Sequence, residues 1–339
     1  MHAPSQGPCP ECLDKSRPLS LTPGKLETRM PRKIIIDTDP GQDDAVAILL
    51  ALASPELEVL SLTAVAGNVN LALTEKNARI IVELAGKTTP VHAGCDRPLA
   101  RPLVTAEHVH GKTGLDGIHL PDPSHPLQDS HAVDHIIDSL RTHPSGSITL
   151  CPLGPLTNIA TAFTRAPDII PRVAEVVLMG GAYFQGGNIT PTAEFNIFVD
   201  PEAAEIVFKS GVPLVVMPLD VTHKALTSRK WVEEMRGLGT PVGQAVAAWT
   251  DFFERFDTAK YGSEGAPLHD PCVIAYLIDP TLFHGRHINV EIETGSALTL
   301  GMTVADWWRV TQREPNAMFM GSVDRDGFYR LLSERLGRL

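Results

Sequence analysis

Residues 34–50 read IIIDTDPGQDDAVAILL, and this stretch decides the fold. Three β-branched residues lead into Asp37, and a Pro-Gly turn separates them from a long apolar run. This order predicts a buried strand, a tight turn and the start of a helix. Side chains alternate along a strand, so Asp37 and Asp39 share one face at its carboxyl end. Asp43 and Asp44 fall in the first helical turn.

The four carboxylates of this stretch therefore converge on one small volume. Packed together and partly buried, they cannot all stay ionised without a compensating charge. Either some of them hold protons or a hard divalent cation neutralises them, and the cation is our working hypothesis. The alternative is that Asp43 caps the helix and Asp44 interacts with its dipole. That alternative accounts for one or two of the four residues, not for the set.

Composition favours a globular protein with a small-molecule partner. The 339 residues are 43% hydrophobic and 20% charged, which is enough for a large core. The net charge of −11, without a local cluster of Lys and Arg, argues against a nucleic acid polymer as partner. No apolar run is long enough to span a bilayer, and the first thirty residues lack the apolar centre of a signal peptide. We therefore expect no membrane partner and a cytoplasmic location.

Residues 1–30 differ in composition from the rest of the chain. They are rich in proline and poor in large apolar residues, which predicts a disordered N-terminal extension outside the core. Cys9 and Cys12 form a CPEC pair there. A single C-x-x-C without a second pair is weak support for zinc or redox chemistry.

From residue 32 onward, strands alternate with amphipathic helices. This pattern predicts an α/β fold with an open, mainly parallel central sheet that carries helices on both faces. The expected strands are 33–37, 57–65, 91–93, 148–151, 174–179 and 214–217. The expected helices are 44–53, 73–85, 132–142, 156–165, 201–209 and 242–256. Over residues 289–308 and 316–338, the pattern predicts a strand pair around Gly295 and Gly301, another strand, and a closing helix begun by Asp324 or Asp326.

Polar residues gather where the predicted strands end. In an open sheet of this kind, ligands bind beyond the carboxyl ends of the strands. The runs found there are DTDPGQDD, AGNVN (66–70), CPLGPLTN (151–158), MGGAYFQGGN (179–188) and PLDVTHK (218–224). Most of the glycines and prolines are explained by turn chemistry, but the repeated Asn and Asp are not. His269 and Asp270 stand at a later loop-to-helix junction, where Asp270 could simply cap the helix.

Taken together, these motifs resemble the nucleoside hydrolase family of the inosine- and uridine-preferring type. The matching pieces are DTDPGQDD, GN at 67–68, LGPLTN, EFNIFVDPEAA (194–204) and HDP (269–271), in the expected order. The resemblance runs from about residue 32 to the C-terminus, and the combination is specific. It implies one Rossmann-like catalytic domain over residues 31–339. Residues 293–308, ETGSALTLGMTVADWW, look like the branch that prefers pyrimidine ribonucleosides.

The resemblance also implies a role for individual residues. Asp39 matches the general base that draws a proton from a metal-bound water, and His269 matches the histidine beside the leaving base, as general acid or as binding residue. The implied Ca²⁺ ligands are Asp37, Asp44, Asp270 and the backbone carbonyl of Leu153. The implied substrate-binding residues are Asp43, Asn68, His110, Met179, Asn188, Glu194 and Asn196.

The chemistry of the implied reaction suits these residue types. An N-glycosidic bond breaks through an oxocarbenium-like transition state, so the site must stabilise positive charge, activate a water and help the base to depart. We expect calcium-dependent hydrolysis of ribonucleosides to ribose and free base, with uridine and cytidine slightly favoured. Direct attack of water opposite the base inverts the anomeric carbon. The resemblance further implies a homodimer or homotetramer.

Two other functions share part of this pattern. A haloacid-dehalogenase-like phosphatase also begins with a strand that ends in two spaced aspartates, but Gly41 stands where that pattern needs Thr or Val. A non-catalytic nucleoside- or ribose-binding protein would keep the sugar site and lose the base or the metal ligands. Phe253, Phe256 and Tyr261 could stack on the nucleobase, although aromatic residues at helical spacing more often belong to the core.

Overall fold

The first predicted strand lies in the middle of the central sheet. The computed structural model describes residues 30–262 and 265–339, and the proposed extension with its Cys9 and Cys12 pair lies outside this described part. Strand β1 (Arg32–Thr38) is buried from Ile34 onward. Ile34 and Ile36 pack into one hydrophobic core and Ile35 into another, because successive side chains of a strand point to opposite faces. The sheet is therefore covered on both sides.

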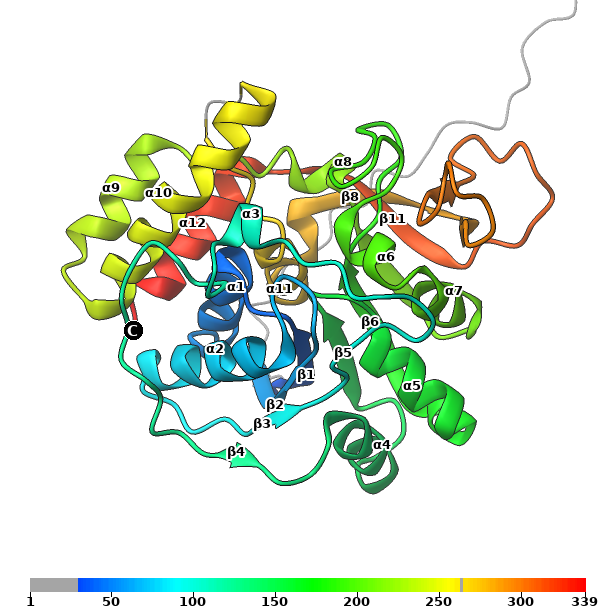
Figure 1. The fold of residues 1–339 in the computed structure, drawn as a ribbon, viewed down its shortest axis with the longest axis horizontal. Helices are drawn as coiled ribbons and strands as arrows, with labels where there is room; N and C mark the ends of the chain where they lie inside the picture. Colours follow the sequence, from blue (N-terminus) through cyan, green and yellow to red (C-terminus); the bar gives the residue numbers. More distant parts are fainter. Residues whose placement is uncertain (1–29, 263–264) are drawn as a thin grey trace, which may run out of the picture. The chain divides into compact units, whose positions relative to one another are not determined.

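The central sheet has nine strands in the order β4-β3-β2-β1-β5-β6-β7-β11-β8 (Figure 1). Its strands pair in parallel, except that β8 runs antiparallel to β11. A separate antiparallel pair joins β9 and β10. The bounds after β1 are β2 (Leu57–Ala64), β3 (Val91–Ala93), β4 (Leu127–Gln128), β5 (Ile148–Pro152), β6 (Val173–Met179), β7 (Leu214–Met217), β8 (Phe283–Ile288), β9 (Val290–Ile292), β10 (Thr303–Ala305) and β11 (Ala317–Val323).

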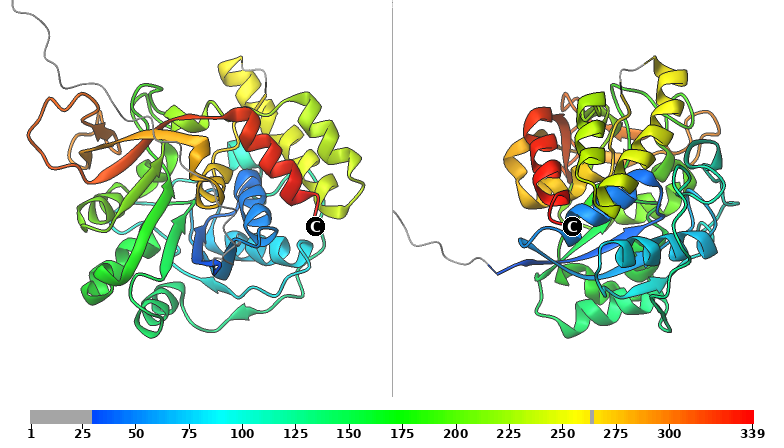
Figure 2. Two further views of the ribbon diagram at one scale, coloured as in Figure 1. Left: turned by 180° about the vertical axis from the view of Figure 1, so that it is seen from behind. Right: turned by 90° about the vertical axis from the view of Figure 1, so that its left-hand side faces the viewer.

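Helices cover the two faces of the sheet, as Figures 1 and 2 show. One core contains residues of α1 (Gln42–Leu52), α2 (Leu71–Leu84), α9 (Arg229–Gly237), α10 (Pro241–Tyr261), α11 (Pro271–Ile278) and α12 (Arg325–Leu336). The other contains residues of α4 (Ala132–Thr142), α5 (Thr157–Arg165) and α7 (Pro201–Lys209). Three short helices stand in the connecting segments: α3 (Glu107–His110), α6 (Phe195–Val199) and α8 (Leu219–Thr222).

The strand order creates a crevice at the centre of the sheet. The chain adds β2, β3 and β4 on one side of β1, and β5 then pairs with its other side. Connections that leave in opposite directions from neighbouring parallel strands open a crevice at their carboxyl ends. The loops after β1 and β5 are DTDPGQDD and the LGPLTN segment, so the topology brings these two motifs together.

The structure confirms the predicted α/β architecture with its mainly parallel central sheet. Residues 31–339 form one compact unit. The strand pair around Gly295 and Gly301 is β9 and β10, and Asp324 caps the closing helix with its side chain. The edge strand β8 was not predicted, because its four central residues are exposed and give no alternation of apolar and polar positions. In the part of the chain that the structure describes, none of the helices has the length and apolar character of a membrane span.

Candidate active site

A cavity at the carboxyl end of the sheet collects nearly all of the predicted site residues. Its empty space, counted together with the open mouth, is about 690 Å³. Every predicted site residue except Asp37 and Asp39 lines it. The cavity walls come from the strand-end loops, from the first turns of α1, α6 and α11, and from α3 and α10.

Asp44 has a structural task at the start of α1. Its Oδ2 accepts a hydrogen bond from the backbone N–H of Gly41 at 2.9 Å, and its Oδ1 accepts one from the hydroxyl of Thr38. Asp44 therefore closes the helix terminus, a task that the capping alternative had assigned to Asp43. The same carboxylate also faces the cavity. Capping and metal binding can both hold, because a carboxylate has about four acceptor positions.

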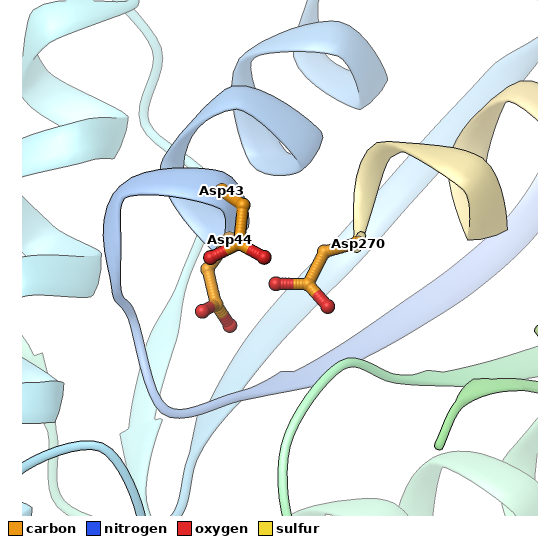
Figure 3. Close-up of side chains that lie close together, drawn as sticks. All are labelled: Asp43, Asp44 and Asp270. Atoms are coloured by element: carbon orange, nitrogen blue, oxygen red, sulfur yellow. The ribbon is translucent and has the colours of Figure 1, made fainter. Parts of the chain in front are cut away.

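Three carboxylates meet across the cavity floor. Oxygen atoms of Asp43, Asp44 and Asp270 all lie within 4.8 Å of one another, and all three residues are buried. Figure 3 shows Asp270 reaching from the start of α11 toward the pair at the start of α1. Asp270 occupies the N-cap position of α11, but its side chain makes no capping hydrogen bond. Its carboxylate is turned to the other two.

Asp39 is held immediately below this group. Its Oδ2 accepts a hydrogen bond from the backbone N–H of Asn68 at 2.7 Å, while its Oδ1 is buried without a hydrogen-bond partner. Gly67, in the loop after β2, and Gly154, in the loop after β5, both pack against the carboxylate of Asp39. A Cβ on either glycine would lie within 2.2 Å of an oxygen of Asp39. Glycine at both positions leaves the room that the carboxylate needs.

Electrostatics favour a cation among these residues. Burial raises the pKa of Asp39, Asp44 and Asp270. Repulsion from neighbouring carboxylates raises the pKa of Asp39 and Asp270 further. A bound divalent cation would remove both penalties, and an all-oxygen donor set suits a hard ion such as Ca²⁺. The converging oxygens of the three-carboxylate group fit such an ion.

The fourth aspartate of the motif lies apart from this group. Asp37 is fully buried, and its Oδ1 accepts hydrogen bonds from the side chains of Thr63 and Asn158. Burial raises the pKa of Asp37 to about 7. Asp43, and not Asp37, completes the trio with Asp44 and Asp270. The other oxygen of Asp37, Oδ2, is buried without a hydrogen-bond partner, so its role as a metal ligand stays a prediction.

Amides and a buried glutamate form the polar wall of the cavity. Glu194 caps α6 by accepting from the backbone N–H groups of Asn196 and Ile197, and burial raises its pKa to about 7. Asn196 donates from Nδ2 to the carbonyl of Leu153 at 2.7 Å and to that of Met179 at 3.2 Å. These bonds fix the direction of the Leu153 carbonyl, which lines the same cavity.

The amide of Asn188 belongs to the same wall. Its Oδ1 accepts from the backbone N–H of Phe195 at 2.9 Å. Backbone N–H groups of residues 195–197 thus hold Asn188 and Glu194, and the carbonyls of Leu153 and Met179 hold Asn196. Such bonds hold polar groups in place before a ligand arrives, which lowers the cost of binding a sugar.

Aromatic and histidine side chains form the other end of the cavity. Nδ1 of His269 lies 2.7 Å from the hydroxyl of Thr222. Its ring stands edge to face with Phe253 at 6.3 Å and is 5.6 Å from the ring of His223. Burial, reinforced by His223 and His110, holds the pKa of His269 well below its usual range.

Several residues that line this end of the cavity were not predicted, or were expected to belong to the core. Phe253 and Phe256 line the cavity, although their helical spacing suggested core positions. The side chain of Tyr261 lies outside the described residues. His108 and His223 also line the cavity without having been predicted. The PLDVTHK run contained the signal for His223, since it follows a strand, whereas nothing in the sequence pointed to His108.

The comparisons with known proteins agree with this geometry. Residues 34–330 match the family described as inosine-uridine preferring nucleoside hydrolase. An uncharacterized protein of Schizosaccharomyces pombe is 52% identical over 308 residues, which are 91% of this chain and 99% of the relative. The pyrimidine-specific ribonucleoside hydrolase RihA of Photobacterium profundum is 47% identical over 309 residues, with coverage of 91% and 99%.

A solved structure shares the whole architecture. A purine-preferring ribonucleoside hydrolase from Gardnerella vaginalis is 34% identical, has a TM-score of 0.85 and covers 90% of this chain and 98% of its own. The matched segment 34–330 includes the aspartate motif, the polar wall and Asp270. The chain therefore belongs to the inosine-uridine preferring nucleoside hydrolase family and is a ribonucleoside N-ribohydrolase.

Proposed function

We propose that the protein hydrolyses the N-glycosidic bond of ribonucleosides in a Ca²⁺-dependent reaction, with pyrimidine nucleosides slightly favoured. The observation that carries the proposal is the convergence of Asp43, Asp44 and Asp270 within 4.8 Å on the cavity that also holds the amide wall. Membership of the family argues against the phosphatase alternative. The nucleoside-binding alternative predicts binding without release of base.

The cation would be held by carboxylate and carbonyl oxygens. Asp44, Asp270 and the backbone carbonyl of Leu153 are its proposed ligands, and Asp43 is proposed to bind ribose hydroxyls. Asp37 stays in the set through the family resemblance. Its Oδ1 is engaged by Thr63 and Asn158, and its Oδ2 is buried without a hydrogen-bond partner. When bound, Ca²⁺ would supply positive charge and coordination positions for a water and the sugar.

Asp39 is proposed as the general base. A base must lie within hydrogen-bond reach of the proton that it removes and must have a free acceptor atom. Oδ1 of Asp39 is such an atom, while Oδ2 is held by the N–H of Asn68. Water delivered from the floor of the cavity meets the sugar opposite the departing base, so the anomeric carbon is inverted and no covalent intermediate is needed.

The apolar end of the cavity is proposed to bind the nucleobase. Phe253 and Phe256 offer ring faces and edges, and His269 lies beside them. The polar wall of Asn68, Asn188, Glu194 and Asn196 would then hold the ribose, with Met179 beside it. The preference for pyrimidines is supported by the 47% identity to a relative named pyrimidine-specific.

A substrate panel tests the proposal. Purified protein is incubated with uridine, cytidine, inosine and adenosine in the presence of Ca²⁺, and the release of reducing sugar is measured. We expect release from all or some of them, with the highest kcat/KM for uridine or cytidine. Failure to release sugar from any nucleoside would overturn the proposal. Binding of a nucleoside without release of sugar would favour the non-catalytic binding protein.

The assembly into a homodimer or homotetramer and the cytoplasmic location stay predictions.

A further inference from the structure

Gln42 is a buried residue of the aspartate motif without a role in the proposed reaction. Its Nε2 donates to the backbone carbonyl of His110 at 2.9 Å and to that of Asp116 at 3.0 Å. Its Oε1 lies 2.7 Å from Nδ1 of the His110 ring. The amide therefore makes three hydrogen bonds to one loop, residues 110–116. This loop borders the cavity through His110.

These bonds determine which nitrogen of His110 carries the hydrogen. A backbone carbonyl can only accept, so the atom of Gln42 that faces two carbonyls is the NH₂ group, and its oxygen faces the ring. That oxygen can also only accept, so Nδ1 of His110 must donate. In a neutral imidazole the other nitrogen, Nε2, then carries a lone pair and accepts.

The surroundings of His110 keep its ring neutral. The ring is buried and stacks on Phe253 with centroids 5.5 Å apart. A Cβ on Gly41 would lie 2.4 Å from its Nδ1, so the ring packs directly on the aspartate turn. Burial lowers the pKa of His110 to about 3. At neutral pH the ring thus presents an acceptor, and not a donor, to a ligand.

We propose that Gln42 is a positioning residue that holds His110 in the Nδ1–H tautomer, so that Nε2 accepts a hydrogen bond from a ribose hydroxyl. The identity of this donor rests on the proposed function. A hydroxyl is the donor that fits, because His110 packs on the turn that carries Asp43, the proposed sugar ligand, and stands beside Asn68. The motif thereby orients a substrate contact on a distant loop.

Asn77 provides a matched control. Its Nδ2 donates to the carbonyl of Pro40 at 3.1 Å and to that of Thr113 at 2.8 Å. Asn77, like Gln42, is a buried amide that ties the same loop to the same turn, but its bonds end on backbone carbonyls and do not include the ring of His110. Asn77→Leu therefore loosens the loop without removing the acceptor at Nδ1.

The tautomer is measured directly by ¹⁵N NMR on the full-length protein labelled at histidine, with His110 assigned through His110→Gln. We expect a protonated Nδ1 and an unprotonated Nε2 in the unsubstituted protein and in Asn77→Leu. Gln42→Leu should shift the hydrogen to Nε2. Gln42→Glu, which keeps an acceptor and loses the donors, should retain the Nδ1–H form. An Nε2–H or cationic ring in the unsubstituted protein, or an unchanged ring in Gln42→Leu, overturns the proposal.

A kinetic arm identifies the hydroxyl. Gln42→Leu should lower kcat/KM for uridine ~10-fold, the size of one lost hydrogen bond, mainly through KM. Among 2′-, 3′- and 5′-deoxyuridine, the analogue that lacks the bonded hydroxyl should be insensitive to the substitution. Equal losses with all analogues would overturn the hydroxyl contact. If no nucleoside is cleaved by the unsubstituted protein, the proposed function fails, while the NMR result still decides the role of Gln42.

Discussion

Oδ1 of Asp39 and the α-carbon of Gly154 are so close that a methyl group on Gly154 would lie 2.2 Å from that oxygen. Gly154 belongs to the loop after β5. This strand is far from Asp39 in sequence, but it pairs with β1, the strand that leads into Asp39. The position of the proposed base is therefore set from two strands at once. A change on the second strand can move the base without touching it.

We expect Gly154→Ala to displace Asp39 and to lower kcat about 100-fold, since a shift of 1 Å at a reacting group can cost that much. Uridine hydrolysis measures the loss, and circular dichroism checks the fold. Gly237→Ala is the control, because a Cβ on Gly237 meets nothing within 4 Å. Normal turnover in Gly154→Ala would mean that Asp39 need not keep its present position.

Asp39→Asn should abolish most of the activity while the protein still binds Ca²⁺. The amide keeps the shape of the side chain and can still accept the N–H of Asn68, but it cannot take up a proton. General-base catalysis contributes about 10²–10⁴-fold, which sets the expected loss in kcat. Calcium binding is followed by calorimetry. Near-normal turnover would show that another group is the base.

Removal of divalent cations should lower both activity and stability. Without a cation, the buried carboxylates of Asp39, Asp44 and Asp270 repel one another or take up protons. At a free Ca²⁺ concentration of about 100 times Kd, binding adds about 2.7 kcal/mol to the free energy of unfolding. Thermal unfolding with EGTA and with added Ca²⁺ measures this difference.

Asp270→Asn should remove that Ca²⁺-dependent rise in Tm. Asp220→Asn is the matched control, since Asp220 is a buried aspartate whose carboxylate accepts two backbone N–H groups outside the three-carboxylate group. Its Tm should still respond to Ca²⁺. A response that persists in Asp270→Asn would place the cation elsewhere.

Acid should destabilise the fold through His135. Its ring stacks on His92 at 3.8 Å, and burial lowers its pKa to about 4, against about 6.5 in an unfolded chain. The unfolded state therefore takes up a proton first as pH falls. The stability contributed by neutral His135 is complete above pH ~6.5 and is lost between ~6.5 and ~4.

Urea unfolding at pH 7.5 and pH 5 measures this effect. His135→Gln should reduce the difference in free energy of unfolding between the two pH values, and His287→Gln, at an exposed histidine of β8, serves as control. An unchanged difference in His135→Gln would assign the acid sensitivity to other groups.

Deletion of residues 1–29 should leave nucleoside hydrolysis intact. The family match begins at residue 34, and each residue of the candidate site lies beyond that point. The deleted and full-length proteins are compared by kcat/KM for uridine and by Tm. A large fall in either would show that the extension contributes to the catalytic domain.

Sequence patterns predicted the fold because the central strands have buried apolar segments. Ile34, Ile35 and Ile36 of β1 and the whole of β5 are buried, which is typical of parallel strands covered on both faces. β8 escaped prediction because it pairs on one side only and exposes its centre, so its residues obey no periodic constraint. Elements constrained on both faces are readable from sequence, and edge elements are not.

The residues of the candidate site could be predicted where they belong to a sequence motif. Asp43, Asp44 and Asp270 converge as expected, although nothing in the spacing of the chain joins α1 to α11. Spacing could not tell which aspartates of the motif meet Asp270, because alternation along a strand gives a face but no distance. The contacts of Gln42 with His110 and of Gly154 with Asp39 could not be predicted from the sequence either. Each joins two residues that are far apart in the chain and meet only in the folded protein.

The two ends of the cavity are built from different kinds of structure. The carboxylates are buried at the starts of α1 and α11, whereas His108 on α3 is exposed and Phe256 on α10 is half-buried. Substitutions at these two more exposed positions can alter the proposed base-binding end while the carboxylates keep their places. Selectivity can therefore diversify among relatives, or be redesigned, independently of the hydrolytic step.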